Sequence, residues 1–207
     1  FPPKFAGTLV FAPQDNLNTD ALYPGKYTYQ DDITPERQAQ VVMENYDPSF
    51  ASSIAQERAR RADNGEDAAV VLVSGYNFGT GSSREQAATA LKYAGVPVVL
   101  AGSFSDVFKR NAINNGLICL QCPELVDDLT SSYAKDGQRG AGGRQPGELS
   151  VLLRDATVSL NSRTGAVGLR FGNGSVKHYT TRPAGIGRSI QEIYVAGGME
   201  SWVKQRL

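Results

Sequence analysis

The sequence has few cysteines, a single histidine, no surplus of charge and no long apolar run, and each shortage excludes a class of protein. Two cysteines in 207 residues cannot form a disulfide framework, which favours a reducing compartment. The 21 Lys and Arg balance the 21 Asp and Glu, so no net field attracts nucleic acid or an acidic membrane. The longest apolar runs, near 68–73 and 96–101, are far too short to cross a bilayer. We therefore expect no nucleic-acid partner and no membrane partner.

What the sequence does contain is the composition of a globular protein, with 41% hydrophobic and 20% charged residues. Its length suits one large domain or two small ones, and we predict a single domain over residues 1–207. The glycine-rich stretch at 134–147 cannot build a core and is expected to be an exposed, mobile loop. Because the chain begins with Phe1 and carries no signal peptide, we expect it to be the C-terminal part of a longer polypeptide.

Strand and helix signals alternate along the first part of the chain. Apolar strands at 68–73 and 96–101 flank a predicted helix at 83–94, which indicates a βαβ unit. Four short strands after the glycine-rich stretch predict a β-meander, at 149–153, 157–161, 166–171 and 175–180. Two more strands are expected at 5–12 and 117–120, and further helices at 35–46, 48–62, 105–115, 123–133, 186–196 and 199–205.

The predicted helix at 48–62 has a recognisable start and a charged side. Asp47 is its candidate N-cap, and Pro48 stands at the first helical position, which proline tolerates. The charged residues of this helix are interpreted as a solvent-exposed face. They are Glu57, Arg58, Arg60 and Arg61.

The stretch between the first apolar strand and its helix is the most informative part of the sequence. Residues 75–81 are glycine-rich, and Ser82 and Glu85 have the spacing of a capping box. Backbone N–H groups in the first helical turn would then favour an anion, and Arg84 can add a bidentate contact to a carboxylate. Two interpretations are open at this point: a site for an anionic ligand, or a well-capped turn without one.

Other glycine-loop motifs do not fit this stretch. A dinucleotide fingerprint needs glycine where Arg84 stands, and the Gly-Lys-Ser/Thr of a Walker loop is absent. The Gly-x-Ser-x-Gly elbow of hydrolases is also absent. The single histidine, His178, falls in the predicted meander and is expected at the surface. A Ser–His hydrolase is therefore poorly supported.

Residues 77–88 read Asn-Phe-Gly-Thr-Gly-Ser-Ser-Arg-Glu-Gln-Ala-Ala and resemble the Ser-Ser-Arg-Glu signature of the aconitase superfamily. Residues 15–20, Asp-Asn-Leu-Asn-Thr-Asp, are similar to that family's Asp-Asn-x-x-Thr-Asp segment. Ser103, Phe104 and the run at 110–117 resemble the segment that follows the signature. The resemblance implies the family's swivel domain, an α/β fold with β, β and α layers, a mixed and partly parallel sheet and a C-terminal β-meander.

The resemblance also implies a reaction: water is eliminated from a tricarboxylate and added back. A [4Fe-4S] cluster held by cysteine thiolates would act as Lewis acid. The chain has only Cys119 and Cys122, so we expect no metal site here and cluster ligands in other domains of the same polypeptide. The chain alone is then expected to be inactive. Both cysteines end a short apolar strand and are expected to be buried structural thiols, with metal or redox use as the alternative.

Residue by residue, the resemblance implies roles at the signature. Ser82 would be the base that takes a proton from the substrate carbon, and Asp20 an active-site acid. Ser83 would hold the substrate or its developing charge, and Arg84 would bind a carboxylate. Further substrate-binding candidates lie in the run at 24–29; they are Lys26, Tyr27, Thr28 and Tyr29. Lys26 either contacts an extra carboxylate or is a solvated side chain. Tyrosines in and near these segments either line a pocket or pack; they are Tyr23, Tyr27, Tyr29 and Tyr76.

Two features resemble the homoaconitase branch of the superfamily: the run Pro-Gly-Lys-Tyr-Thr-Tyr at 24–29, and Gln86 after the signature. No arginine lies between Asp20 and Thr34, where aconitase proper has a second substrate-binding arginine, and this disfavours citrate. The branch implies interconversion of homocitrate or homoaconitate with homoisocitrate in lysine synthesis, in the mitochondrial matrix. An isopropylmalate isomerase small subunit and a non-catalytic carboxylate-binding module stay open as alternatives.

Overall fold

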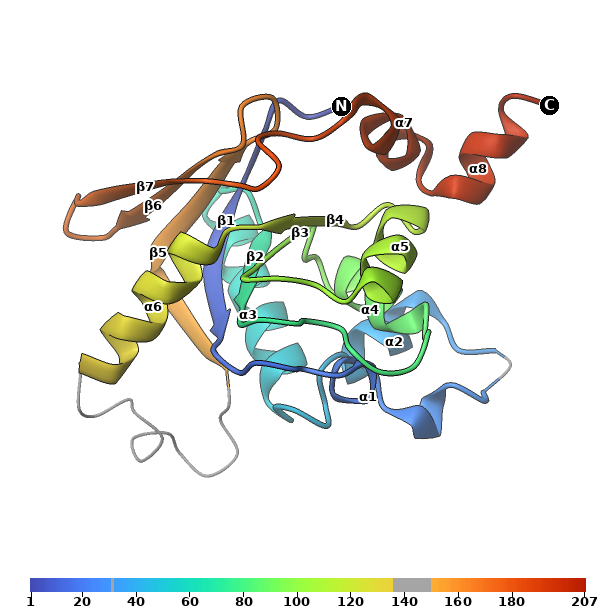
Figure 1. The fold of residues 1–207 in the computed structure, drawn as a ribbon. Helices are drawn as coiled ribbons and strands as arrows, with labels where there is room; N and C mark the ends of the chain where they lie inside the picture. The colour runs from blue at the N-terminus through green and yellow to red at the C-terminus, as the bar shows by residue number, and fades with distance from the viewer. Residues whose placement is uncertain (31, 136–149) are drawn as a thin grey trace.

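The computed structural model describes residues 1–30, 32–135 and 150–207. Its centre is a seven-stranded sheet with the order β4-β3-β2-β1-β5-β6-β7 (Figure 1). The strands β1 to β4 run parallel to one another, whereas β5, β6 and β7 add as antiparallel neighbours. The strands are β1 (Lys4–Ala12), β2 (Val70–Ser74), β3 (Val98–Ala101), β4 (Ile118–Gln121), β5 (Val151–Asn161), β6 (Ala166–Phe171) and β7 (Val176–Thr180). The predicted mixed, partly parallel sheet with a C-terminal meander is confirmed.

Helices connect the parallel strands and close the chain. In chain order they are α1 (Thr19–Leu22), a 3-10 turn (Gly25–Tyr27), α2 (Pro35–Val41), α3 (Phe50–Asp63), α4 (Gln86–Tyr93), α5 (Asp106–Asn114), α6 (Pro123–Lys135), α7 (Arg188–Ala196) and α8 (Met199–Lys204). The predicted βαβ unit is β2-α4-β3. Within the described residues, none of these helices is long and apolar enough to span a bilayer. The loop predicted at 134–147 lies outside the described residues from 136 onward.

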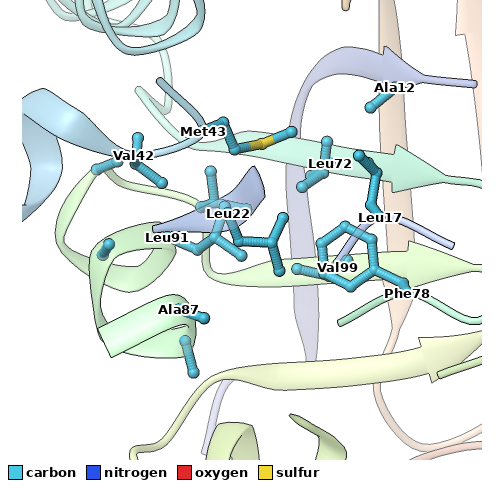
Figure 2. Close-up of a cluster of buried hydrophobic side chains, with 14 of the residues drawn as sticks. Ala12, Leu17, Leu22, Val42, Met43, Leu72, Phe78, Ala87, Leu91 and Val99 are labelled. Carbon is cyan, nitrogen blue, oxygen red and sulfur yellow. The ribbon is translucent and has the colours of Figure 1, made fainter. Parts of the chain in front are cut away.

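Side chains of β1 point alternately into two cores, one on each face of the sheet. Val10 and Ala12 belong to a core with α1 to α5, part of which Figure 2 shows. Leu9 and Phe11 belong to the other core, which α6 and the curled strands β5 to β7 complete. Since strand residues alternate between the faces, a strand covered on both sides needs apolar residues throughout. This explains the continuous apolar runs of β2 and β3.

The sheet has two edges that end differently. At β4, the backbone N–H of Arg182 donates to the carbonyl oxygen of Gln121 (2.7 Å), so the segment after β7 returns to cover that edge. At the other edge, the side chains of Lys177 and His178 in β7 are exposed. His178 therefore lies at the surface, as predicted.

Several element boundaries differ from the sequence predictions. The strands expected at 149–153 and 157–161 are one strand, β5, whose register against β1 shifts between Thr8 and Leu9. The helix expected at 35–46 ends at Val41, because Met43 has a left-handed backbone (φ 58°) and donates its N–H to Leu22. The helix expected from Pro48 begins at Phe50.

Asp47 is not the N-cap of α3; Ser49 holds that position. The Asp47 carboxylate instead accepts hydrogen bonds from the backbone and hydroxyl of Ser49 and of Ser150. Ser150 directly precedes β5, more than a hundred residues away. A residue that resembles a local cap thus joins two distant segments.

The sequence prediction of a solvent-exposed charged face on α3 holds for Arg60, which is exposed, but not for the whole face. Glu57 and Arg61 are buried, at 1% and 9% exposure. The Glu57 carboxylate accepts hydrogen bonds from the hydroxyl of Thr8 (2.8 Å) and from Arg60 (2.8 and 2.9 Å), and Arg154 approaches it at 3.5 Å. The Arg60 contact holds the pKa of Glu57 below its ordinary value, despite the burial. This cluster joins α3 to β1 and β5.

We expect Glu57→Gln to lower the free energy of unfolding by about 1.5–3 kcal/mol, the usual range for hydrogen bonds to charged groups. The lowered pKa gives the effect a direction with pH. The stabilisation is complete above the ordinary glutamate pKa of about 4.3, and it is lost as the pH falls through the lower pKa of the folded state. The difference between wild type and variant in denaturant unfolding should therefore shrink below about pH 4.

A matched control is Glu200→Gln, which removes an exposed partner of Lys204 in α8. Such surface pairs contribute only about 0–1 kcal/mol. Equal losses for the two variants would show that the Glu57 cluster does not stabilise the fold.

Candidate active site

Three loops meet at the carboxyl ends of β1, β2 and β3, the edge where open α/β sheets place their ligand sites. Several backbone hydrogen bonds join them. Thr19 donates to the carbonyl oxygen of Thr80 (2.8 Å), Gly79 donates to Leu17 (2.7 Å), and Phe78 donates to Ser103 (3.0 Å). The segments that resemble the aconitase motifs are therefore brought together by the sheet.

Left-handed backbone shapes two of these loops. Asn16 (φ 57°) and Asn77 (φ 55°) both adopt a conformation that side chains other than glycine rarely take. Their side chains bond to each other, with the Asn77 amide donating to Asn16 at 2.8 Å. Gly79 (φ 75°) lies so close to Phe108 that a Cβ atom would stand 2.2 Å from its ring. The glycine is thus required both by its backbone angle and by this close approach.

The predicted capping box does not form. Helix α4 begins at Gln86, its N-cap residue is Glu85, and no side chain caps it. Ser82 and Ser83 lie before the helix and are exposed. The hydroxyl oxygen of Ser82 lies 3.1 Å from that of Thr19. The interpretation of Ser82 as part of a well-capped turn is therefore wrong. The prediction that residues 83–85 form the first helical turn is also wrong.

Arg84 and Asp20, 64 residues apart, form an ion pair at the carboxyl ends of these strands. Nη1 of Arg84 donates to Oδ1 of Asp20 (2.7 Å) and to the carbonyl oxygen of Tyr23 (3.1 Å). The same carboxylate accepts from the N–H of Gly25 (2.9 Å) and, at Oδ2, from the amide of Asn45 (3.0 Å). The hydrogen bond from Arg84 is the main reason that the pKa of Asp20 lies below its ordinary value. Asp20 is therefore a carboxylate at neutral pH.

The Arg84 side chain is only 23% exposed, and its fork is partly free. Both of its hydrogen bonds in the described part of the chain come from Nη1. A Cβ atom at Gly25 would lie 3.1 Å from Nη2, so glycine at this position leaves room beside the guanidinium. A guanidinium held on one edge by a carboxylate is pre-organised to bind an anion with its other nitrogens.

The segment at 24–29 lies beside this ion pair but has its own contacts. Lys26 forms a salt bridge with Glu44, and the hydroxyl of Tyr27 donates to the same carboxylate at 3.0 Å. The contact with Lys26 is the largest cause of the lowered pKa of Glu44. Tyr29 is 90% exposed, whereas Tyr23 is fully buried. Lys26 is thus paired with Glu44 and not simply solvated. Tyr23 packs in the hydrophobic core and does not line a surface pocket.

The two cysteines are buried, as predicted, at 7% for Cys119 and 0% for Cys122. Burial raises the pKa of both thiols, that of Cys122 to about 11. In this environment both side chains are protonated thiols near neutral pH. The described residues contain no group of three or more side chains that could hold a metal ion.

Sequence reasoning missed two contributors to the site. Thr19 and Asn45 contact Ser82 and Asp20 respectively. Thr19 lies inside the Asp-Asn-x-x-Thr-Asp motif at 15–20, but the sequence does not show its contact with Ser82. Asn45 is 25 residues from Asp20 in a turn after α2, and nothing in the local sequence distinguishes it.

Comparisons with known proteins agree with this arrangement. Residues 1–125 match the family model of the aconitase C-terminal domain. The chain is 59% identical to a protein named homoaconitase, mitochondrial, of Mycosarcoma maydis and 52% identical to one of Cryptococcus neoformans. Each match covers all of this chain but only 28% of the relative. A solved structure of 3-isopropylmalate dehydratase from Methanocaldococcus jannaschii is similar, with a TM-score of 0.67 and 28% identity over 98% of this chain and 95% of that one.

We expect the pKa of Asp20 to rise towards its ordinary value of about 3.9 in the variant Arg84→Met, because the hydrogen bond that lowers it most is lost. Carboxyl-carbon NMR shifts recorded against pH would measure this. Glu44 is the internal control, since its low pKa depends chiefly on Lys26. An unchanged Asp20 titration in the variant would contradict the ion pair.

Proposed function

The chain belongs to the family of aconitase C-terminal domains, and on that premise we propose that it is the substrate-binding and base-supplying domain of a homoaconitase. The enzyme would interconvert homocitrate or homoaconitate with homoisocitrate in lysine synthesis. The observation that carries the proposal is Ser82, an exposed hydroxyl unused by any helix cap and followed two residues later by the half-buried Arg84. The names of the relatives support homoaconitate as substrate.

In the proposed elimination, Ser82 receives the proton. The substrate C–H bond breaks, and its electron pair becomes the second bond of the alkene. The hydroxyl group leaves the neighbouring carbon as hydroxide, which takes the electron pair of the broken C–O bond. The deprotonated oxygen of Ser82 takes the proton and becomes a hydroxyl. Serine is a weak base at its ordinary pKa, so positive charge nearby must stabilise its anion. Arg84 supplies that charge from the same loop, whose tight turn is held by the Arg84 N–H donating to the Ser82 carbonyl oxygen at 2.9 Å.

Arg84 is proposed to bind a substrate carboxylate, and Asp20 to hold Arg84 in place. A group whose pKa is lowered by an ion pair is poorly suited to donate protons near neutral pH. We therefore assign Asp20 to orientation rather than to the acid role that the resemblance implies. This assignment explains why the carboxylate is surrounded by donors from Arg84, Gly25 and Asn45.

The remaining site candidates are proposed as substrate contacts. Ser83 is exposed next to Ser82 and would hold the substrate or its developing charge. In the segment 26–29, Tyr29 is open to solvent, whereas Lys26 must exchange Glu44 for a substrate carboxylate in order to bind it. Tyr27 shares Glu44 with Lys26, and Thr28 follows in the same turn.

Aconitase-family enzymes use a [4Fe-4S] cluster, which supplies a Lewis acid for the departing hydroxyl. The thiols of this chain do not fit that role, because there are only two and both are buried. We propose that the cluster ligands lie in the remainder of the polypeptide. The chain spans 28% of the first relatives, which leaves ample sequence for further domains. The relatives' names also support a mitochondrial setting, which we propose to be the matrix.

The test of this proposal is turnover of the full-length enzyme, with its cluster reconstituted, on homoaconitate, isopropylmalate and cis-aconitate. Homoaconitate is expected to give the highest kcat/KM. Preference for isopropylmalate would establish the alternative that the similar dehydratase structure favours. The purified chain alone serves as a control and should be inactive. No turnover of the full-length enzyme on any of the three substrates would leave a carboxylate-binding module.

Ser82→Ala in the full-length enzyme should lower kcat by about 10²–10⁴-fold, the usual contribution of a general base. KM should change little, because the oxygen acts mainly in the transition state. Ser175→Ala, an exposed serine in the turn before β7, is the matched control. A kcat above about a tenth of wild type would show that Ser82 is not the base.

Arg84→Lys should raise KM and lower kcat/KM by roughly 10- to 100-fold, since a point charge replaces the planar fork and one charge-assisted hydrogen bond is lost. Arg188→Lys, an exposed arginine of α7, should behave as wild type. Unchanged kinetics in Arg84→Lys would mean that Arg84 only holds Asp20.

A further inference from the structure

Thr19 lies within the site, directly before Asp20, and has no role in the reaction proposed above. Its side chain is buried, at 3% exposure, although it stands at the start of the short surface helix α1. Its hydroxyl oxygen lies 3.1 Å from the hydroxyl oxygen of Ser82, 63 residues along the chain. A buried hydroxyl bonded to the exposed side chain that is assigned as base calls for an explanation beyond packing.

The backbone holds Thr19 from both sides. Its N–H donates to the carbonyl oxygen of Thr80 (2.8 Å), and its own carbonyl oxygen accepts from the N–H of Tyr23 (2.9 Å). As a β-branched residue it also has few side-chain rotamers. Ser82, in contrast, lies in an irregular loop and is exposed. In this pair Thr19 is the fixed member, so its hydroxyl determines where the Ser82 oxygen rests.

The backbone at Gly81 lies in contact distance of Thr19. Its backbone is left-handed (φ 98°), a conformation that favours glycine, and a Cβ atom there would lie 3.5 Å from Oγ1 of Thr19. The chain therefore passes directly over Thr19 immediately before Ser82. The distance between the two hydroxyls follows from the loop backbone and not from a flexible side chain alone.

The direction of the hydrogen bond depends on the protonation of Ser82. While both hydroxyls carry protons, either can donate. A deprotonated Ser82 can only accept, so Thr19 is then the donor of the pair, and hydrogen bonds to an anion are shorter and stronger than those between neutral groups.

We propose that Thr19 is a positioning residue for the reaction, whose hydroxyl orients Oγ of Ser82 and donates to it when Ser82 is deprotonated. The inference rests on the proposed role of Ser82 as base. It assigns Thr19 no contact with substrate. Its effect should therefore appear in the proton-transfer step and not in substrate affinity.

The experiment compares Thr19→Val, Thr19→Ala and Thr19→Ser in the full-length enzyme, on whichever tricarboxylate the wild type turns over best. The valine and alanine variants should lose about 10- to 100-fold in kcat, as for one hydrogen bond to a charged group, with KM nearly unchanged. Serine restores the donor and should recover most of the activity. With substrate deuterated at the carbon that loses its proton, the isotope effect on kcat should increase in the valine and alanine variants, which a merely structural defect would not cause.

Thr89→Val is the matched control, because the hydroxyl of Thr89 in α4 donates to the side chain of Gln38 in α2 (2.6 Å) and not to the site. If the melting temperature shows that Thr19→Val distorts the fold, Thr19→Ser is compared with Thr19→Ala instead. These two variants differ only by the hydroxyl group. Equal kcat for serine and alanine, or an unchanged isotope effect, would overturn the inference. If Ser82→Ala is inactive, either of these outcomes rejects only the role of Thr19, and Ser82 stays the proposed base. If Ser82→Ala is active, the proposed function of Ser82 as base is itself rejected.

Discussion

The pairing of β1 with two different neighbours is the constraint on which the remaining structure depends. The strand is parallel to β2 on one side and antiparallel to β5 on the other, so it joins the α/β half to the meander. Gly7 allows β1 to approach the segment before β2, because a Cβ atom at this position would lie only 2.4 Å from the carbonyl oxygen of Ala69. Thr8 ties the strand to Glu57 of α3. The carboxyl end of β1 then leads into the loop that carries Thr19 and Asp20.

Patterns of short range were predictable, and departures from them have tertiary causes. The alternation of apolar strands and helices predicts β2-α4-β3 because a parallel strand must be apolar on both faces. The start of α4 was not predictable, since residues 83–85 lie in a turn in which Arg84 donates its backbone N–H to Ser82 and its guanidinium N–H to the distant Asp20. Periodicity equally fails to show that Glu57 is buried, because its partners Thr8 and Arg154 come from distant strands.

The candidate site divides in the same way. Ser82, Ser83 and Arg84 are contiguous, and their resemblance to a family signature identifies them without a structure. The family motifs identify Arg84 and Asp20 separately. They do not show that the two side chains form an ion pair or that this pair lowers the pKa of Asp20. Asn45 carries no signal, because an amide in a turn is common and only the fold places it beside Asp20.

The unequal edges of the sheet bear on how the protein avoids self-association. An uncovered strand edge is a template for further strands from other molecules. The backbone bond between Arg182 and Gln121 occupies part of the β4 edge with a segment of the same chain. At β7, a strand of five residues, the exposed Lys177 forms a salt bridge with Asp128 of α6 at 2.7 Å. A short edge strand offers few unpaired backbone groups to a second copy, and this ion pair ties the strand to a helix of the same chain. The open edge of the sheet is therefore short and anchored, which limits the strand pairing that another molecule could make there.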